Sequence, residues 1–314
     1  MKKIVVLKGG NSPEREVSLV SGREIATQLR NLAYDVLELD PADYPDLSEL
    51  VQYVKSSEVE VVFNGLHGGS GEDGQIQAVL SSSGIPFTGS GFVCCAITMD
   101  KYVTKLIVQN EGIPVPDGMI LRDDLLCDYQ STTDLQGFEQ RFGLPLVVKP
   151  NAAGSSVGIH IVNDLEGLKP AVLDAFNFGK TVLVERYITG RELTVTVLAG
   201  KALPVVEIKP KEGFYDYKNK YSKGNTIYEV PATLSAEETE LIQLYAQRIW
   251  KACYCHAYAR IDFRYDGEQF YFLEVNTLPG MTPLSLSPMA AKAANFGFGE
   301  FLTKIIEESL RKTK

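Results

Sequence analysis

The segments Arg260-Ile261-Asp262 and Glu274-Val275-Asn276-Thr277-Leu278-Pro279-Gly280 lie on two successive apolar runs near the end of the chain. Asp262, Glu274 and Asn276 offer two carboxylates and an amide oxygen. These hard ligands suit Mg²⁺, which keeps octahedral geometry and shares its remaining positions with water and phosphate. Taken singly, either carboxylate is better explained as the end of a strand on a solvated turn. Together with the upstream motifs, they predict a magnesium site that binds a nucleoside triphosphate.

The composition is that of an ordinary soluble protein. The 314 residues suit two or three domains, with 45% hydrophobic and 23% charged residues. No apolar run approaches the ~18–20 residues of a membrane span. The basic start at Lys2-Lys3 is followed by an apolar segment too short for a signal peptide, so we expect a first strand in a cytoplasmic protein. A net charge of −9 argues against nucleic acid as a general partner.

The cysteines indicate a reduced compartment. There are five, an odd number that includes the adjacent pair Cys94-Cys95. The spacing Cys253-x-Cys255-His256 is open to interpretation as a zinc site, but no second ligand pair lies at finger-like spacing. We therefore expect these cysteines to pack as small apolar residues.

The order of apolar and helical patterns predicts three units. In the first, β-branched runs alternate with helical patterns, as in a parallel α/β sheet; the runs are 2–7, 34–39 and 59–64, and the helices 15–30 and 46–56. Ligands bind at the carboxyl ends of such strands, where the loops 9–18 and 67–74 follow. The second unit begins near Met99 with a helix over 101–111, and continues with strands at 145–150 and 158–162 and a helix to about 176. The third has strands near 181–186, 191–199 and 203–208, a helix at 235–252, and then the two acidic strands.

Two lysines and a flexible loop indicate phosphate binding in the second unit. Gly154-Ser155-Ser156-Val157-Gly158 can bring backbone N–H groups close to phosphate, although a tight hairpin explains it equally well. It is not a Walker loop, because Lys149 precedes the glycines on a strand. Lys101 opens a helix, where unsatisfied N–H groups favour phosphate. The strand that ends at Glu185 could present a backbone edge to an adenine.

A basic, aromatic loop spans 209–225 in this otherwise acidic chain. Long loops of this kind are usually functional or disordered. Such a loop could grip nucleic acid. Its isolation favours a lid that folds over an anionic transition state.

These motifs resemble those of the D-alanine–D-alanine ligases of the ATP-grasp superfamily, over essentially the whole chain. The resemblance rests on blocks in the family's order: GGNSPEREVSL (9–19), HGGSGEDG (67–74), TMDK (98–101), VVKPNAAGSSVG (147–158), FYDYKNKY (214–221), ARIDF (259–263) and FLEVNTLPGMTPLSLSP (272–288). It implies an α/β (α+β) ATP-grasp fold in three lobes, 1–96, 97–182 and 183–314. The N-terminal lobe would hold a parallel sheet, and the two α+β lobes after it would enclose ATP.

The resemblance also implies a two-step ligation. The carboxylate of one D-alanine attacks the γ-phosphate of ATP, and the amine of a second displaces phosphate from D-alanyl phosphate. Lys101 and Lys149 would hold ATP phosphates, with adenine and ribose bound by Glu185, Arg186, Ile188 and Glu192. Asp262, Glu274 and Asn276 would bind two Mg²⁺ ions, with Mn²⁺ as an alternative.

By the same resemblance, the amino-acid substrates have their own residues. Glu14 would take the ammonium of the first D-alanine, with His67 beside it. Arg260 and the N–H of Gly280 would stabilise the oxyanion. The second substrate would meet Ser285 and Leu286. The lid would be closed by Ser155, Tyr221 and Glu14, with Lys220 on the γ-phosphate.

Further expectations concern the product and the partners. Relatives that make D-alanyl-D-lactate commonly carry Phe at the lid position, so Tyr221 favours the dipeptide product. The chain departs from many members at Ala152-Ala153 and from some at Leu284. The resemblance implies a cytoplasmic homodimer that serves peptidoglycan synthesis, with no membrane partner. The alternatives are a D-alanyl-D-lactate or other carboxylate–amine ligase on the same fold, and a catalytically silent nucleotide-binding protein.

Overall fold

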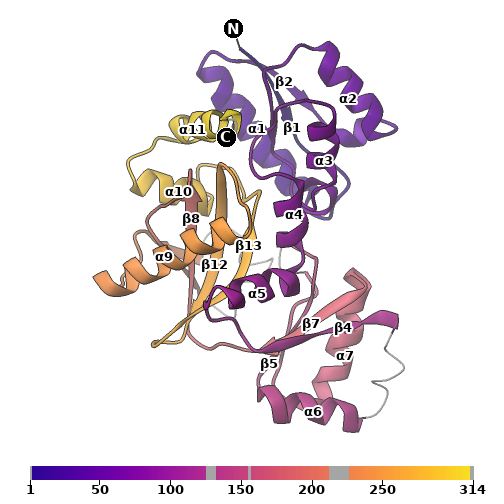
Figure 1. Ribbon diagram of the computed structural model, residues 1–314, viewed down its shortest axis with the longest axis vertical. Helices are drawn as coiled ribbons and strands as arrows, with labels where there is room; N and C mark the ends of the chain where they lie inside the picture. Colours follow the sequence, from indigo (N-terminus) through magenta and orange to yellow (C-terminus); the bar gives the residue numbers. More distant parts are fainter. Residues whose placement is uncertain (1, 125–131, 155–156, 212–225, 312–314) are drawn as a thin grey trace.

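The computed structural model describes all residues except 1, 125–131, 155–156, 212–225 and 312–314, and only the backbone of 132–136. Its strands form three sheets, which occupy successive parts of the chain (Figure 1). Sheet A has the order β2-β1-β3, sheet B the order β4-β7-β5-β6, and sheet C the order β11-β10-β8-β12-β13 with β9 paired to β8. The predicted mixed α/β class is confirmed.

Sheet A is parallel, as the alternation of strands and helices predicted. Its elements are β1 (Lys3–Leu7), α1 (Arg15–Asn31), β2 (Asp35–Leu39), α2 (Leu47–Ser56), β3 (Val61–Asn64) and α3 (Gln75–Ser82). Short 3-10 helices, η1 (Pro41–Asp43) and η2 (Gly69–Gly71), follow β2 and β3. Asp46 caps α2 by accepting hydrogen bonds from the backbone N–H groups of Ser48 and Glu49.

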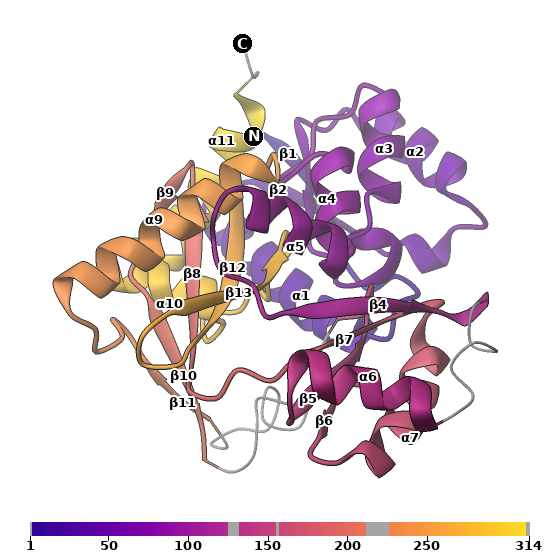
Figure 2. The ribbon, with the colours of Figure 1, turned by 60° about the horizontal axis from the view of Figure 1, so that its bottom comes forward.

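Two helices connect sheet A to sheet B: α4 (Phe92–Met99) and α5 (Lys101–Asn110). Sheet B is antiparallel and one of its faces is covered by two helices (Figure 2). Its elements are β4 (Gly118–Arg122), α6 (Thr132–Phe142), β5 (Leu146–Pro150), β6 (His160–Val162), α7 (Leu165–Ala175), η4 (Phe176–Phe178) and β7 (Thr181–Arg186). The strand β7 runs four residues beyond the expected lobe boundary at 182.

Sheet C carries the two acidic strands. Its elements are β8 (Arg191–Leu198), β9 (Lys201–Ala202), β10 (Val206–Pro210), β11 (Thr226–Glu229), α9 (Ala236–Ala252), β12 (Tyr258–Tyr265) and β13 (Phe270–Asn276), followed by α10 (Leu286–Ala293) and α11 (Phe298–Leu310). A capping box of Ser235 and Glu238 starts α9. The prediction of a strand over 203–208 is wrong at its start, since β10 begins only at Val206. Pro204 has no N–H group to donate to the ladder.

The N-terminal and C-terminal parts of the chain share one hydrophobic core. Ile4 and Val6 of β1 belong to the same buried cluster as Phe301 and Ile305 of α11. Figure 1 shows α11 beside α1 at the edge of sheet A. Sheets A and C are therefore held together by apolar packing, whereas sheet B packs its own core against α6 and α7.

Candidate active site

The predicted metal and oxyanion residues share one face of sheet C. Register pairs Asp262 with Glu274 and Arg260 with Asn276 across β12 and β13. Side chains of alternate residues point to the same face of a strand, so all four lie together. A β-bulge follows Asp262, and it leaves Leu273 as an extra residue on β13. Both Leu273 and Glu274 consequently line the same cleft.

Asp262 is the most heavily bonded member of this face. Arg260 donates to both of its oxygens, from Nε to Oδ1 at 2.9 Å and from Nη2 to Oδ2 at 2.7 Å. Thr194 donates its hydroxyl to Oδ1 at 2.5 Å, and Asn276 Nδ2 lies 2.9 Å from Oδ2. The carboxylate is thus held rigidly, and an arginine stands where a cation is expected.

Lys101 joins this face to the loop that follows β5. Its Nζ lies 3.3 Å from Glu274 Oε2 and donates to the carbonyl of Ala153 at 2.7 Å. Asp100 caps α5 and so fixes the start of the helix that carries Lys101. The predicted phosphate lysine and the predicted metal ligand are therefore in direct contact.

Glu185 lies between two buried lysines at the end of β7. Lys149 Nζ is 2.6 Å from Oε1, and Lys105 Nζ is 2.8 Å from Oε2. Burial alone would raise the pKa of Glu185, but the two ammonium groups outweigh it and lower that pKa. Burial lowers the pKa of Lys105 to about 8, against the opposing attraction of Glu185. Of this Lys–Glu–Lys cluster, Lys149 and Glu185 line the cleft between sheets B and C.

The cleft between sheets B and C brings most of the predicted nucleotide residues together. Apolar side chains from β5 and β6 line one side of the cleft, and side chains of β12 and β13 line the other. Its lining includes the predicted residues Lys101, Lys149, Glu185, Arg186, Ile188, Glu192, Asp262 and Glu274. A flat aromatic base would fit between the apolar walls, with the lysines beside it for phosphate.

Glu14 connects the first lobe to the loop after β5. It directly precedes α1, and its carboxylate lies between two glycines. A Cβ at Gly154 would stand 2.5 Å from Glu14 Oε2, and a Cβ at Gly68 would stand 2.4 Å from it. A methyl group at either position would therefore displace the Glu14 carboxylate, and at Gly68 the positive φ of 64° favours glycine as well.

His67 links the loop after β3 to the segment that contains Gly280. Its Nδ1 lies 2.8 Å from the carbonyl of Leu278, and its Nε2 lies 3.0 Å from Ser21 Oγ. A carbonyl can only accept, so Nδ1 carries the proton. Burial lowers the pKa of His67 to about 4, with Arg260 adding to the shift, and the ring is neutral. Ser21 Oγ also accepts from the N–H of Met281 at 3.2 Å, so both flanks of Gly280 are fixed.

Glu72 forms a second link to the same segment. Its Oε2 accepts from the N–H of Gly68 at 2.7 Å, and its Oε1 accepts from the N–H of Leu278 at 3.2 Å. Burial, reinforced by repulsion from Glu14, raises the pKa of Glu72 to about 8. Glu72 thus lies beside the predicted ammonium site as a carboxyl group that holds its proton near neutral pH.

Gly280 and Ser285 face each other across a tight turn. A Cβ at Gly280 would lie 3.2 Å from Ser285 Oγ. The same hydroxyl accepts from the N–H of Thr282 at 3.1 Å, and Ser285 is the N-cap of α10, which begins at Leu286. The predicted second-substrate residues therefore stand at a helix N-terminus, where a carboxylate is favoured.

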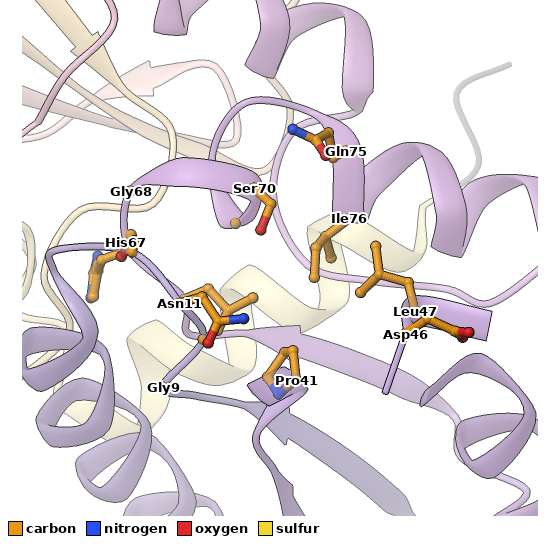
Figure 3. Close-up of a pocket in the computed structure, with 14 residues that line it drawn as sticks. Gly9, Asn11, Pro41, Asp46, Leu47, His67, Gly68, Ser70, Gln75 and Ile76 are labelled. Carbon is orange, nitrogen blue, oxygen red and sulfur yellow. The ribbon is translucent and has the colours of Figure 1, made fainter. Parts of the chain in front are cut away.

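A further cavity of about 200 Å³ opens at the carboxyl edge of sheet A. Figure 3 shows His67 at one end of it and Leu47 with Asp46 at the other. Gly9 and Gly10 follow β1, and Gly68 follows β3. The loops expected to bind ligand do converge at this edge, as a parallel sheet requires.

Three predicted residues lie outside the residues that the structure describes: Ser155, Lys220 and Tyr221. Residues with roles that were not predicted include Ser21, Glu72, Lys105, Thr194 and Arg264. Periodicity could have identified two of them. Lys105 follows Lys101 by one helical turn, and Arg264 follows Asp262 by one strand period, so each lies on the same face as a predicted residue. Ser21 and Thr194 carried no local signal.

Cation binding at this face agrees with the chemistry of its oxygen donors. Among the residues that the structure describes, no three His, Cys, Asp or Glu side chains gather as a metal site. Asp262 and Glu274 supply two carboxylates, and an ion there would take its other ligands from phosphate, water and the Asn276 amide. That amide turns its nitrogen to Asp262 and would have to rotate to offer its oxygen.

The cysteines that the structure describes pack as expected, whereas Cys127 lies outside the described residues. Cys94, Cys253 and Cys255 are buried, with Cys94 Sγ 3.6 Å from Cys255 Sγ. Within the described part of the chain, no helix is long and apolar enough to cross a membrane.

Comparison with known families gives two matches. Residues 40–90 match the family described as D-ala D-ala ligase N-terminus, and residues 107–307 match the one described as D-ala D-ala ligase C-terminus. A curated D-alanine–D-alanine ligase of Mannheimia succiniciproducens is 43% identical over 311 residues, which are 98% of each chain.

Solved structures agree in fold over almost the entire chain. The D-alanine–D-alanine ligase of Bacillus anthracis matches with a TM-score of 0.86 at 37% identity, and its complex with ATP with 0.84 at 34%; each match covers 99% of this chain and 98% of that one. The VanG D-Ala:D-Ser ligase of Enterococcus faecalis matches with 0.82 at 29%, covering 98% of this chain and 99% of that one.

Proposed function

The chain belongs to the D-alanine–D-alanine ligase family, and from this premise we propose that it joins two D-alanine molecules as ATP is cleaved to ADP and phosphate, with the ATP bound in the cleft between sheets B and C. It is an ATP-dependent ligase with an ATP-grasp fold. The observation that carries the assignment of the cleft is the convergence of Lys101, Lys149 and the acidic pair Asp262 and Glu274 on one cavity. Phosphoryl transfer needs this combination of cations and metal-binding oxygens.

ATP would lie with its base at the end of β7. Glu185 would accept from the adenine amino group, and the main chain of Arg186 and Ile188 would contact the base edge. Glu192 would accept from the ribose hydroxyls. Lys101 and Lys149 would then reach the phosphates, since both residues line the same cavity.

Asp262, Glu274 and Asn276 would hold two Mg²⁺ ions, with Mn²⁺ as an alternative. Ions bound there would neutralise charge on the transferring phosphoryl group. Arg260 and Lys101 now neutralise these carboxylates, at 2.7 Å and 3.3 Å. Both cations would turn to substrate when the ions bind.

The first substrate would lie between Glu14 and Arg260. Glu14 would bind its ammonium, with His67 beside it as a neutral ring. A carboxylate oxygen attacks the γ-phosphorus, the bond to the β–γ bridging oxygen breaks, and ADP leaves. The products of this step are D-alanyl phosphate and ADP.

The second substrate would bind with its carboxylate at Ser285 and Leu286. Its amine attacks the carbonyl carbon of D-alanyl phosphate, and the C–O bond to phosphate breaks as the amine loses a proton. Arg260 and the N–H of Gly280 would stabilise the oxyanion of the tetrahedral intermediate. Preorganised donors of this kind are each worth about 3–4 kcal/mol.

We assign the lid to the loop 209–225. Tyr221 and Ser155 would bond with Glu14, and Lys220 would reach the γ-phosphate. Tyr221 favours D-alanine over D-lactate as acceptor, which keeps the dipeptide as the main product. A ligase for another acceptor would share the first step and differ around Ser285 and at the lid position Tyr221.

Larger-scale assignments follow from the same premise. We propose three lobes and move the second boundary from 182 to Arg186, because β7 belongs to sheet B: the lobes are then 1–96, 97–186 and 187–314. We also propose that the enzyme is a homodimer that acts in the cytoplasm. Sedimentation of the purified protein at two monomers' mass supports the dimer, and sedimentation at 34.6 kDa contradicts it.

The proposed function is tested by product analysis. The protein is incubated with ATP, Mg²⁺ and D-alanine, with parallel reactions that add D-lactate or D-serine, or that replace D-alanine by L-alanine. We expect D-alanyl-D-alanine and equal amounts of ADP and phosphate, and no product from L-alanine. Binding of ATP without phosphate release would instead support a silent nucleotide-binding protein. Preferential use of D-lactate would overturn the assignment of Tyr221.

A further inference from the structure

Arg264 lies on the same face of β12 as Asp262, and its guanidinium makes three hydrogen bonds in the nucleotide cleft. Nε donates to the carbonyl of Ile188 at 3.1 Å, Nη1 to Glu192 Oε2 at 3.2 Å, and Nη2 to the hydroxyl of Tyr187 at 2.8 Å. The guanidinium carbon also lies 5.4 Å from the centre of the Tyr187 ring. All four residues line the cleft.

The bonded partners of Arg264 belong to the connection between sheets B and C. Tyr187 and Ile188 follow β7 of sheet B, and Glu192 pairs with Arg264 across β8 and β12 of sheet C. This connection lies directly against the end of β12, since a Cβ at Gly190 would stand 2.1 Å from the carbonyl oxygen of Tyr265. One side chain therefore fixes both the segment next to the base and the carboxylate next to the ribose.

Another arginine in sheet C shows what a purely structural pair looks like. Arg191 donates from Nε and Nη2 to both oxygens of Glu207, and from Nη2 to the carbonyl of Thr233. Neither Arg191 nor Glu207 lines the nucleotide cleft. Arg264 differs because only one of its hydrogen bonds goes to a carboxylate, and the others go to the segment that would hold the base.

We infer that Arg264 is a positioning residue for nucleotide selection: it holds Glu192 and the Ile188 segment so that ribose hydroxyls and the purine edge are bound together. The inference rests on the proposed function, because it takes the base and ribose to lie where the family places them. The planar fork of arginine holds its donors in a fixed and extended arrangement, whereas the three donors of a lysine sit on one compact, rotatable ammonium group. Without Arg264, Glu192 would lose the ion pair that holds its carboxylate from β12.

The test measures ATP and 2′-deoxyATP affinity by calorimetry for the wild type, Arg264→Met, Arg264→Lys and Glu192→Gln. Methionine keeps the length and the apolar contacts of the side chain but removes its donors. We expect Arg264→Met to bind ATP about tenfold more weakly, the loss typical of a hydrogen bond to a charged group. Its preference for ATP over 2′-deoxyATP should fall towards one, as in Glu192→Gln. Arg264→Lys should lie between this variant and the wild type.

The control is Arg191→Met, which should lower the melting temperature but keep ATP affinity within about twofold. If Arg264→Met bound ATP and 2′-deoxyATP more weakly by the same factor, Arg264 would have a merely structural role and the inference would be overturned. The inference would also be overturned if Arg264→Met kept the ATP affinity of the wild type while Glu192→Gln lost ATP affinity. If the wild type itself bound no ATP, the proposed function would fail instead.

Discussion

Arg260 and Asp262 are two residues apart on β12 and form an ion pair at the active site. The guanidinium donates twice to the carboxylate, which holds it at the edge of the cleft before substrate binds. We predict that Arg260→Ala lowers kcat by about 10²–10³-fold, the usual cost of one oxyanion donor. Phosphate release at saturating ATP and D-alanine measures this. ATP affinity should change by less than about threefold.

Arg191→Ala is the matched control for Arg260→Ala, because it removes an arginine–carboxylate pair from the same sheet outside the cleft. It should keep kcat within about twofold. An Arg260→Ala variant that turned over as fast as the wild type would contradict the assignment of the oxyanion donor.

Glu72 gives the stability of the ligand-free protein a pH dependence. Its pKa is about 8 in the folded state and 4.5 as an ordinary side chain. Between these values the folded state holds a proton that the unfolded state has released, so the free energy of unfolding falls as pH rises. His67, with a pKa of about 4 against 6.5, acts in the opposite sense below pH 6.5. We predict a net fall in melting temperature from pH 6.5 to 8.

The Glu72→Gln variant should lose most of this fall, because glutamine does not titrate. Glu24→Gln, a change on the exposed face of α1, serves as the control and should keep the slope of the wild type. Thermal unfolding of both variants at several pH values measures how the melting temperature of each depends on pH. An unchanged slope in Glu72→Gln would show that another group titrates.

At the scale of a residue, sequence patterns identified the chemistry but not all of its supports. Lys101, Lys149, Glu185, Asp262 and Glu274 were predicted and do line one cleft. Thr194 was not, because its bond to Asp262 depends on the register between β8 and β12. Register is set by long-range pairing, which a single polar residue on a strand does not report.

At the scale of an element, the loop after β5 touches the start of α1. The close approach of Gly154 to Glu14 makes this contact testable, because a Cβ at Gly154 would stand 2.5 Å from Glu14 Oε2 and one of the two would have to move. We predict that Gly154→Ala displaces Glu14 and raises the KM for the first D-alanine on the order of tenfold, since small misplacements of binding groups are costly. Steady-state kinetics with D-alanine varied will measure it.

Gly137→Ala is the control for Gly154→Ala. Nothing lies within 4 Å of a Cβ at Gly137, which lies within α6. Alanine there should raise stability by up to about 1 kcal/mol and leave the KM unchanged. Equal kinetics in the two variants would argue against a role for the Gly154 contact.

Elements with strong periodicity were predictable, and those that depend on partners were not. The helices at α1 and α9 and the strands β12 and β13 follow their patterns. The helix α4 was missed because FVCCAITM is a continuous apolar run that periodicity cannot assign. The strand β4 was missed because it is an edge strand that is defined by pairing with β7, far along the chain.

At the scale of the whole molecule, the C-terminal helix completes the core of the first lobe. Phe301 of α11 is fully buried in the cluster that includes Ile4 of β1. We predict that Phe301→Ala lowers the free energy of unfolding by about 3–5 kcal/mol, as large core truncations do. Urea denaturation followed by circular dichroism measures this change.

The control for Phe301→Ala is Leu284→Ala, since 75% of the Leu284 surface is exposed. It should shift the free energy of unfolding by no more than about 0.5 kcal/mol. A Phe301→Ala variant as stable as the control would contradict the shared core. No local signal predicted this packing, because the amphipathic pattern of α11 shows that it has a buried face but not which sheet covers it.

The central claim is that one D-alanine is activated as an acyl phosphate before the peptide bond forms. If so, a carboxylate oxygen of the first substrate must leave with phosphate. The most direct measurement is mass analysis of the phosphate released when D-alanine carries ¹⁸O in its carboxylate. We predict one ¹⁸O in each phosphate together with D-alanyl-D-alanine. Phosphate free of ¹⁸O, formed alongside the same dipeptide, would contradict the account.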